Sequence, residues 1–509
     1  MKRRIPSWLA GASFVLLAGC TVGPDYHAPT AALPARWTPP APQDSARQPS
    51  RIVQGDFDTR WWETFQDPEL SALVARVAST NLDLKAASVR LLQARATRQV
   101  VDADRLPSLQ GELGYQHARS SQHGLLDIAG LDGKHDYNLW QYGVDASWEL
   151  DLWGRVRREA EAADANVAAT ADLRDAVALE LLAETATRYV RLRGVQANEA
   201  ILRQSLDIAR DILRLSEIRV KDGVATKLEV AEARAQMHRI EARLPQLENE
   251  RVRLVNALSF LVAEPPRALE GELAAKPLPP VPADIPVGLP GELVTRRPDV
   301  RAAEARLHAA TAQIGVAIGD FYPRITLSAG LNLQAMRFGD LDSWGSRAFG
   351  VGPAISVPIF EGGRLKGQLA LRNAQQQEAM IAWQRVVLQA WHEVDDAMSA
   401  FSTGQEAHDR LVSTERESRL ALQVARQQYL GGAVDFLNVL SAQRDLIDAQ
   451  QALVSSSTDV SVSLVRLYKA LGGGWDATSD MTQRVPATAT AGATAVTGET
   501  TIAAAQASR

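Results

Sequence analysis

Residues 140–153 read WQYGVDASWELDLW, and this stretch decides the fold. Its even-numbered positions carry the apolar side chains Trp140, Tyr142, Val144, Ala146, Trp148, Leu150 and Leu152. Its odd-numbered positions are mainly polar and include Gln141, Asp145, Ser147, Glu149 and Asp151. Because side chains alternate between the two faces of a strand, this pattern predicts a β-strand with one apolar and one polar face.

Alternation of the same kind predicts four strands in total. They span residues of about 108–118, 139–152, 324–335 and 348–360. Each is about ten residues long or slightly more, which suits a tilted strand that crosses a bilayer. A soluble β-sandwich is the alternative, but no second sheet is predicted that could cover these strands. An open sheet leaves unpaired backbone groups in lipid, so we expect several chains to build one closed, water-filled barrel of eight, twelve or sixteen strands.

Two very long helices are predicted next to the strands. No proline occurs from Ser108 to Leu244 or from Ile359 to Val485. The segments of about 154–220 and 363–429 would each be ~100 Å long at ~1.5 Å per residue. Apolar residues recur every seven positions at Val439, Leu446, Leu453, Val460 and Leu467. Such heptads indicate coiled-coil packing or a helical barrel.

The chain also repeats itself. Asp83-Leu84-Lys85-Ala86-Ala87 matches Asp299-Val300-Arg301-Ala302-Ala303 at an offset of 216 (83 to 299). Gly154-Arg155 matches Gly363-Arg364 at an offset of 209 (154 to 363). We therefore predict two homologous halves, 61–263 and 298–474, each with helices, two strands and a long helical hairpin. A Pro-rich connector at 264–297 would join them, and the fold class would be mainly α with a β-barrel part.

The N-terminus has the form of a lipoprotein leader. Lys2, Arg3 and Arg4 precede a short apolar run that ends in Leu17-Ala18-Gly19-Cys20. Cys20 is the only cysteine of the chain, so we predict that residues 1–19 are a signal peptide and that Cys20 carries N-palmitoyl and S-diacylglycerol groups. An ordinary signal peptide with an accidental cysteine is the alternative. Thr21, rather than Asp, follows Cys20, which favours the outer membrane.

Both ends of the mature chain have biased compositions. Residues 20–60 are rich in proline and are predicted to form an extended tether. Residues 475–509 consist largely of Ala and Thr, which predicts a disordered tail.

Composition and motifs exclude several classes of function. The formal net charge is only −5, from 55 basic and 60 acidic residues, and no basic stripe for nucleic acid is present. The eight histidines are scattered, and neither a HExxH motif, a Walker A loop nor a nucleophile elbow occurs. We therefore predict no enzyme, no catalytic residue, no metal site and no cofactor beyond the lipid.

Several motifs together resemble the outer-membrane factors, which are the TolC- and OprM-like lipoprotein channels of tripartite efflux pumps. The matching stretches are Val22-Gly23-Pro24-Asp25-Tyr26, Trp61-Trp62, Arg296-Arg297-Pro298-Asp299-Val300, Phe321-Tyr322-Pro323, Pro358-Ile359-Phe360-Glu361-Gly362-Gly363 and Tyr429 to Leu440. The resemblance implies a homotrimer with a twelve-stranded outer-membrane barrel, a periplasmic α-helical barrel and a mixed equatorial belt. It also implies two partners, a periplasmic adaptor and an inner-membrane pump, commonly of the resistance-nodulation-division type.

The resemblance also implies where a gate would lie. The turns near Gly223 and Gly432 would form the periplasmic tip, which closes the resting pore and docks the adaptor. The gate residues would be Leu437, Asn438, Ser441, Arg444 and Asp445. The docking residues would be Arg219, Asp222, Gly223, Tyr429, Gly431 and Gly432. The alternative is that Leu437 and Tyr429 are coiled-coil core and that the charged residues form a solvated face.

Ser441 departs from the pattern of the family. Many relatives carry a carboxylate at this position, which could form an ionic tie with Arg444. Serine cannot form that tie, so the gate would be looser or would be held by Asp445.

The sequence as a whole predicts an outer-membrane channel subunit of a tripartite efflux pump. It would be a gated, passive exit duct for drugs and other small toxic compounds, and would contribute to antibiotic resistance. One alternative is the channel of a type I protein-secretion system. Another is a structural lipoprotein that spans the periplasm, which would not need the polar strand face of residues 141–151.

Overall fold

The computed structural model describes residues 21–31, 34, 37, 50–55, 60–121 and 135–475. The predicted signal peptide, Cys20 and residues 476–509 of the predicted tail lie outside these ranges. Trp475, predicted to begin the tail, instead packs against the folded part: its indole Nε1 donates to Arg296 O at 2.9 Å.

The internal repeat appears as three pairs of helices whose members have equal lengths. The pairs are α3 (Leu82–Ala103) with α7 (Pro298–Gly319), at 22 residues each; α4 (Arg155–Lys221) with α8 (Arg364–Leu430), at 67 each; and α5 (Lys227–Leu261) with α9 (Phe436–Ala470), at 35 each. The offset is 216 residues for the first pair (82 to 298) and 209 for the other two (155 to 364). The two halves of the sequence therefore fold into the same series of helices.

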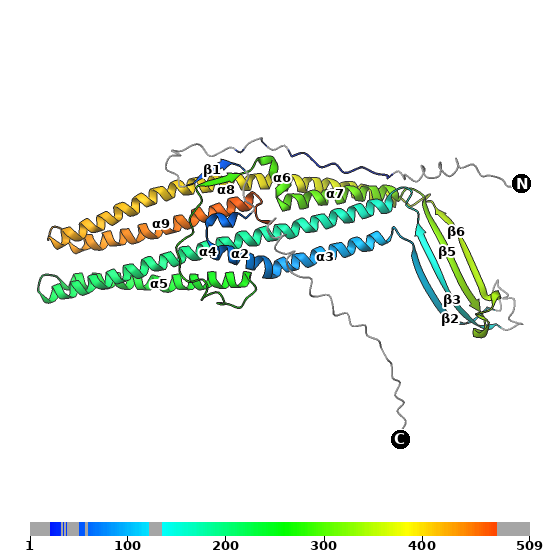
Figure 1. Cartoon of the computed structure of the whole chain (residues 1–509), viewed down its shortest axis with the longest axis horizontal. Coiled ribbons are helices and arrows are strands. Elements are labelled where there is room, and N and C mark those ends of the chain that lie inside the picture. Colours follow the sequence, from blue (N-terminus) through cyan, green and yellow to red (C-terminus); the bar gives the residue numbers. More distant parts are fainter. Residues whose placement is uncertain are drawn as a thin grey trace, which may run out of the picture.

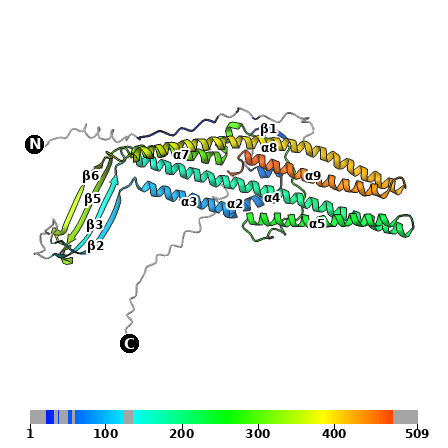
Figure 2. The same ribbon diagram turned by 180° about the vertical axis from the view of Figure 1, so that it is seen from behind.

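The helices form one long layer. α4 and α8 run along its whole length, and α7 and α9 lie end to end between them (Figures 1 and 2). α3 and α5 flank α4 on its other side, with α3 toward the strands and α5 toward the far tip (Figure 1). In the described part of the chain, none of the helices combines the length and the apolarity that crossing a membrane requires.

Four long strands form an antiparallel sheet at one end of this layer. They are β2 (Ser108–Arg119), β3 (Asp136–Glu149), β5 (Arg324–Ala335) and β6 (Arg347–Ser356), in the order β2-β3-β5-β6. The bounds of two predicted strands differ from these by three or more residues. β3 begins and ends three residues earlier than predicted, and β6 ends at Ser356 instead of 360. The end of β6 at Ser356 follows from its partner strand, because Ser356 pairs with Arg324, the first residue of β5.

The register of the sheet separates its two faces. One row across the four strands contains Gly111, Val144, Leu331 and Phe349, and the next contains Leu109, Ala146, Ala329 and Val351. No second sheet covers this apolar face among the described residues, and Leu113 and Phe349 are 84% and 78% exposed in a single chain. Glu112, Asp145 and Asn332 belong to the opposite face. The alternation in the sequence thus corresponds to one apolar and one polar face of the sheet.

A second, smaller sheet was not predicted. β1 (Arg51–Gln54) in the tether pairs in parallel with β4 (Asp284–Val287) in the connector. The tether and the Pro-rich connector are therefore joined by a ladder.

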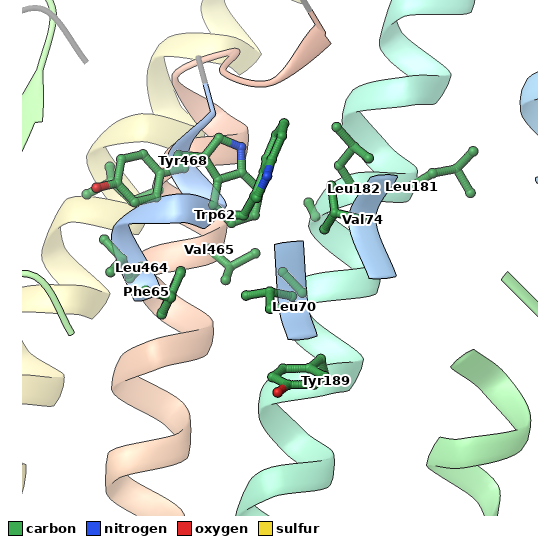
Figure 3. Close-up of a cluster of buried hydrophobic side chains, with 14 of the residues drawn as sticks. Trp62, Phe65, Leu70, Val74, Leu181, Leu182, Tyr189, Leu464, Val465 and Tyr468 are labelled. Atoms are coloured by element: carbon green, nitrogen blue, oxygen red, sulfur yellow. The ribbon is translucent and has the colours of Figure 1, made fainter. Parts of the chain in front are cut away.

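The largest hydrophobic cluster lies midway along the helical layer. The 3-10 helix η1 (Trp61–Phe65) and helix α2 (Pro68–Thr80) pack there against α4 and α9. Figure 3 shows Trp62, Phe65, Leu70 and Val74 between the side chains of these two long helices. The Trp61 ring also stacks on Tyr468, with 5.5 Å between the ring centroids. This cluster includes Ala470, the last residue of α9.

Candidate gate at the tips of the helical hairpins

The two hairpins turn by the same mechanism at their tips. Gly223 follows α4 with φ +73°, and Gly432 follows α8 with φ +72°. Glycine adopts this left-handed conformation without the steric cost that a Cβ atom adds, so each long helix can end abruptly. The next helix begins four residues after each glycine, at Lys227 and at Phe436.

Tyr429 ties the two hairpins of one chain together. Its hydroxyl donates to Glu229 Oε2 at 2.7 Å, and Glu229 belongs to the first turn of α5. The guanidinium of Arg219, near the end of α4, lies 4.8 Å from the centre of the Tyr429 ring. The ring also contacts Phe436, with 5.4 Å between centroids. Tyr429 thus touches α4, α5 and α9 while it belongs to α8.

The environment keeps the Tyr429 hydroxyl in its donor form. Burial, followed by the hydrogen bond to Glu229, raises the pKa of Tyr429 to about 12. The hydroxyl is therefore protonated throughout the neutral range. A hydrogen bond to a carboxylate is stronger than one between neutral groups, so this contact suits a lock between two elements.

The five predicted gate residues share one face of α9. Leu437, Asn438, Ser441, Arg444 and Asp445 follow helical spacing and are all exposed, with Leu437 56% exposed. The opposite face of the same helix is buried and contains Val439, Leu440, Gln443 and Ile447. An exposed apolar side chain among polar neighbours, at the very tip, is the arrangement that a constriction would need.

Several predicted ties are not formed within one chain. In the described residues, neither Arg444 nor Asp445 has an ion-pair partner, and Asn438 Nδ2 makes only a long contact of 3.4 Å to Asp435 O. Asp222 caps α4 through its backbone N–H and stays exposed, so it does not join the Tyr429 cluster. Gly431 and Gly432 lie in the second turn, exposed to solvent.

Glu229 is the residue that the sequence analysis missed. Thr226 and Glu229 form a capping box at the start of α5, and this pattern is visible in the sequence as T-x-x-E after Gly223. The pattern marks a helix start, but it does not reveal that the same carboxylate accepts the Tyr429 hydroxyl from 200 residues away.

A second candidate site lies at the other end of α4, where residues 21–26, called the strap below, cross the helix. Val22 N donates to Trp153 O at 3.0 Å. Arg158 Nη2 donates to Asp25 Oδ1 at 2.6 Å, and Arg158 Nε donates to Val22 O at 3.3 Å. The guanidinium of Arg158 holds the pKa of Asp25 below its usual range. Arg158 itself is 5% exposed, so the strap covers it.

The end of the strap packs against α7. The Tyr26 ring stacks on His308 with 4.2 Å between centroids, and its hydroxyl lies 3.2 Å from Glu304 Oε1. His308 Nε2 lies 2.9 Å from Glu161 Oε1. Burial alone would raise the pKa of Glu161, but hydrogen bonds from Arg158 and His308 outweigh burial and lower it. The residues directly after the predicted lipidation site are therefore fixed beside the junction of helices and strands.

The described residues show no cluster of three or more His, Cys, Asp and Glu side chains that could hold a metal ion.

Comparison with known proteins gives consistent results. The sequence profile described as "Outer membrane efflux protein" matches residues 73–264 and 289–473. "Probable outer membrane lipoprotein SilC" of Salmonella typhimurium is 30% identical over 472 residues, which cover 92% of this chain and 98% of that protein. "Solvent efflux pump outer membrane protein SrpC" of Pseudomonas putida is 31% identical over 470 residues, covering 91% and 97%.

A solved structure agrees over the same range. The outer-membrane channel OprN superposes with a TM-score of 0.81 at 35% identity. The match covers 90% of this chain and 100% of the OprN chain. This agreement confirms the predicted fold class of long helical hairpins with a β-barrel part.

Proposed function

Because the chain belongs to the outer membrane efflux protein family, we propose that three copies of it close into one duct whose gate is formed by the hairpin tips. The chain is an outer-membrane component of an efflux pump, as its motifs predicted. It works with a periplasmic adaptor and an inner-membrane pump, the other two parts of such tripartite systems. Members of this family are channel proteins rather than enzymes.

The open sheet is the observation that carries the proposal. β2 and β6 form its two edges, and neither edge is paired with another strand in the described residues. Unpaired edges cannot remain in lipid, and one apolar face of the sheet has no cover. Pairing β6 of one copy with β2 of the next would remove both edges and direct the apolar face to lipid.

The helical layer has matching edges. On α3, the apolar side chains Leu82, Val89 and Val100 are exposed along one stripe. On α8, at the opposite edge of the layer, Ile381 and Leu388 are exposed and lie seven residues apart. Joining the α8 edge of one copy to the α3 edge of the next copy would bury both stripes. Head-to-tail contacts of this kind generate a ring when the rotation closes.

In the closed duct, the exposed face of α9 would look inward at the tip. Leu437 would then form a ring of apolar side chains, and Asn438, Ser441, Arg444 and Asp445 would meet their counterparts from other copies. The hydrogen bond between Tyr429 and Glu229 would hold the hairpins in the closed arrangement. Docking of the adaptor at Arg219, Asp222 and the glycine turns would break this hydrogen bond.

The substrate class that we propose is small organic compounds. Relatives are named for solvent efflux, for toluene efflux and, in another case, for pyoverdine export. A type I secretion channel is the less favoured function, because these relatives are named for export of small molecules.

Planar-bilayer recordings with the full-length protein test the duct. We expect discrete conductance steps that are small in the resting state. Absence of any conductance, both for the protein as it is and for a variant with a weakened tip, would contradict the proposal. In a strain that expresses the partner pump, deletion of the gene should lower solvent and drug export, and unchanged export would contradict the efflux role.

A further inference from the structure

A recess in the helical layer lies where α9 ends and α7 begins. Its volume is about 610 Å³, which is within the range of sites for small organic molecules. α4 and α8 form its side walls, while Ala470 at the end of α9 and Pro298 at the start of α7 close it along the axis. Figure 1 shows these two shorter helices end to end between the long ones.

Glu180 on α4 separates the recess from the hydrophobic cluster around η1 and α2, although Ala397 and Ala470 contribute to both. On α4, Ala178, Leu181 and Leu182 are buried in that cluster, whereas Leu179 and Glu180 line the recess. Residues 178 and 180 are separated by about 200° around the helix, so Glu180 points away from the cluster, while Leu179 lies between the two directions. η1 and α2 add a further layer on their side, and a closed ring has more room for that layer outside than inside.

The position of the gate residues on α9 also indicates that the recess faces the inside of the duct. Arg466 of α9 lines the recess and follows Ser441 by 25 residues (441 to 466), which is almost seven turns at 3.6 residues per turn. Arg466 therefore lies on the same side of α9 as the proposed gate face. If the gate face looks into the duct, the recess opens into the duct as well. To this extent the inference rests on the proposed function.

Most charged groups around the recess are already paired. Arg297 contacts Glu393 Oε2 and Asp299 Oδ2, each at 2.7 Å, and its Nη1 also donates to Ala470 O at 3.0 Å. Lys469 forms an ion pair with Glu180. These closed pairs offer a ligand little net charge.

Two charged residues remain, one acidic and one basic. Asp396 of α8 and Arg466 of α9 both line the recess and are exposed, and neither has an ion-pair partner among the described residues. Between them the lining is apolar and small, with Leu179, Ala397 and Ala400. A molecule that matches this surface has an apolar body, one cationic group for Asp396 and one anionic group for Arg466.

We propose that this recess binds amphipathic zwitterions on their way through the duct. Binding is weak, because solvent-exposed ion pairs contribute little and a passing compound must also leave. Each of the two charges increases the affinity about fivefold. The recess is a site in the wall of the channel that is separate from the gate at the tip.

Three fluorescent compounds with the same dansyl body test this proposal. Nα-dansyl-lysine carries an ammonium and a carboxylate, dansylcadaverine lacks only the carboxylate, and dansyl-norleucine lacks only the ammonium. Each is titrated against the full-length protein in lipid nanodiscs, with empty nanodiscs to subtract partition into lipid. We expect Nα-dansyl-lysine to bind about fivefold tighter than either of the other two.

The variants assign the charges. Arg466→Gln should lower the affinity for Nα-dansyl-lysine about fivefold and leave the affinity for dansylcadaverine unchanged. Arg466→Lys should restore most of the affinity for Nα-dansyl-lysine. Asp396→Asn should lower the affinity for Nα-dansyl-lysine and leave the affinity for dansyl-norleucine unchanged. Asp395→Asn, one residue away and outside the recess, is the matched control and should have no effect.

Equal affinities for the three compounds, or an affinity for Nα-dansyl-lysine that neither variant lowers, would overturn the proposal, as would absence of binding above the empty nanodiscs. Conductance of the same preparations is recorded separately. A conducting protein without zwitterion binding contradicts this inference alone, whereas a protein that does not conduct contradicts the proposed duct.

Discussion

Gly23 is the residue on which the strap depends. Its φ is +93°, and a Cβ atom at this position would lie 2.5 Å from Gly315 Cα. Gly23→Ala should therefore lift the strap from α4 and α7, at a cost of about 2 kcal/mol or more. Limited proteolysis of the strap measures the change. Gly271→Ala, where no atom lies within 4 Å of the added Cβ, is the control, and equal protection of the strap in both variants would contradict this role.

The hydroxyl oxygen of Tyr429 can be removed to test whether its hydrogen bond keeps the tip closed. Tyr429→Phe removes the hydroxyl that donates to Glu229 and keeps the ring beside Arg219 and Phe436. The loss of about 2 kcal/mol per chain should shift the balance from closed to open about thirtyfold per copy. The resting conductance should rise. Tyr115→Phe in β2 removes a hydroxyl far from the tip and should leave the conductance as it was.

Asp172 should make the stability depend on pH. Burial raises the pKa of Asp172 to about 6, against the attraction of Arg301, whose Nη2 lies 2.7 Å from Asp172 Oδ1; Asp175 and Glu304 raise it further. The pKa is higher in the folded state than in the unfolded state. The stabilising contribution of this group is therefore complete below pH ~4 and is lost as the pH rises through about 6.

Asp172→Asn should remove this dependence. Relative to the unchanged protein, the variant should gain up to about 3 kcal/mol per chain between pH 4 and pH 7, because one pKa unit corresponds to about 1.4 kcal/mol. Unfolding temperatures in detergent across this range measure the effect, with Asp395→Asn as an exposed control. Parallel pH profiles for the Asp172 variant and the unchanged protein would show that Asp172 does not titrate in this range.

At the scale of elements, the two hairpins must have equal lengths for their tips to meet. Seven residues inserted into both α4 and α5 should move Arg219 and Glu229 about 10 Å from Tyr429, while the faces of the helices stay in phase. Resting conductance should rise. The same insertion in α8 and α9 as well should restore the closed state. A closed channel with only one lengthened hairpin would show that the tips do not depend on this match.

The sequence predicted the long elements well and the short ones poorly. Gly154 and Gly363 precede the two 67-residue helices, and uninterrupted alternation predicted β5 to the residue. Arg51–Gln54 and Asp284–Val287 are four residues long, too short for alternation to be recognised. The contacts of Glu229 and Asp25 were missed because each partner lies more than a hundred residues away in the sequence.

At the scale of the whole molecule, the proposed number of copies can be measured directly. Native mass spectrometry of the detergent-solubilised protein should give three chains per particle, because the resemblance to outer-membrane factors implies a barrel of twelve strands and each chain contributes four. Two or four chains per particle would contradict the proposed arrangement. Substitutions Ile381→Glu and Leu388→Glu on the α8 edge should reduce the trimer, while Leu437→Glu at the tip should not.

The distance between strap and tip has a consequence for the cell envelope. α4 runs without a proline from the strap, beside Gly154, to the turn at Gly223, and 67 residues correspond to about 100 Å. A rigid helix of this length fixes the distance between the strap and the tip. The gap that remains for the adaptor is then set by the spacing of the two membranes, so a cell with a wider periplasm should need a longer adaptor to use this protein.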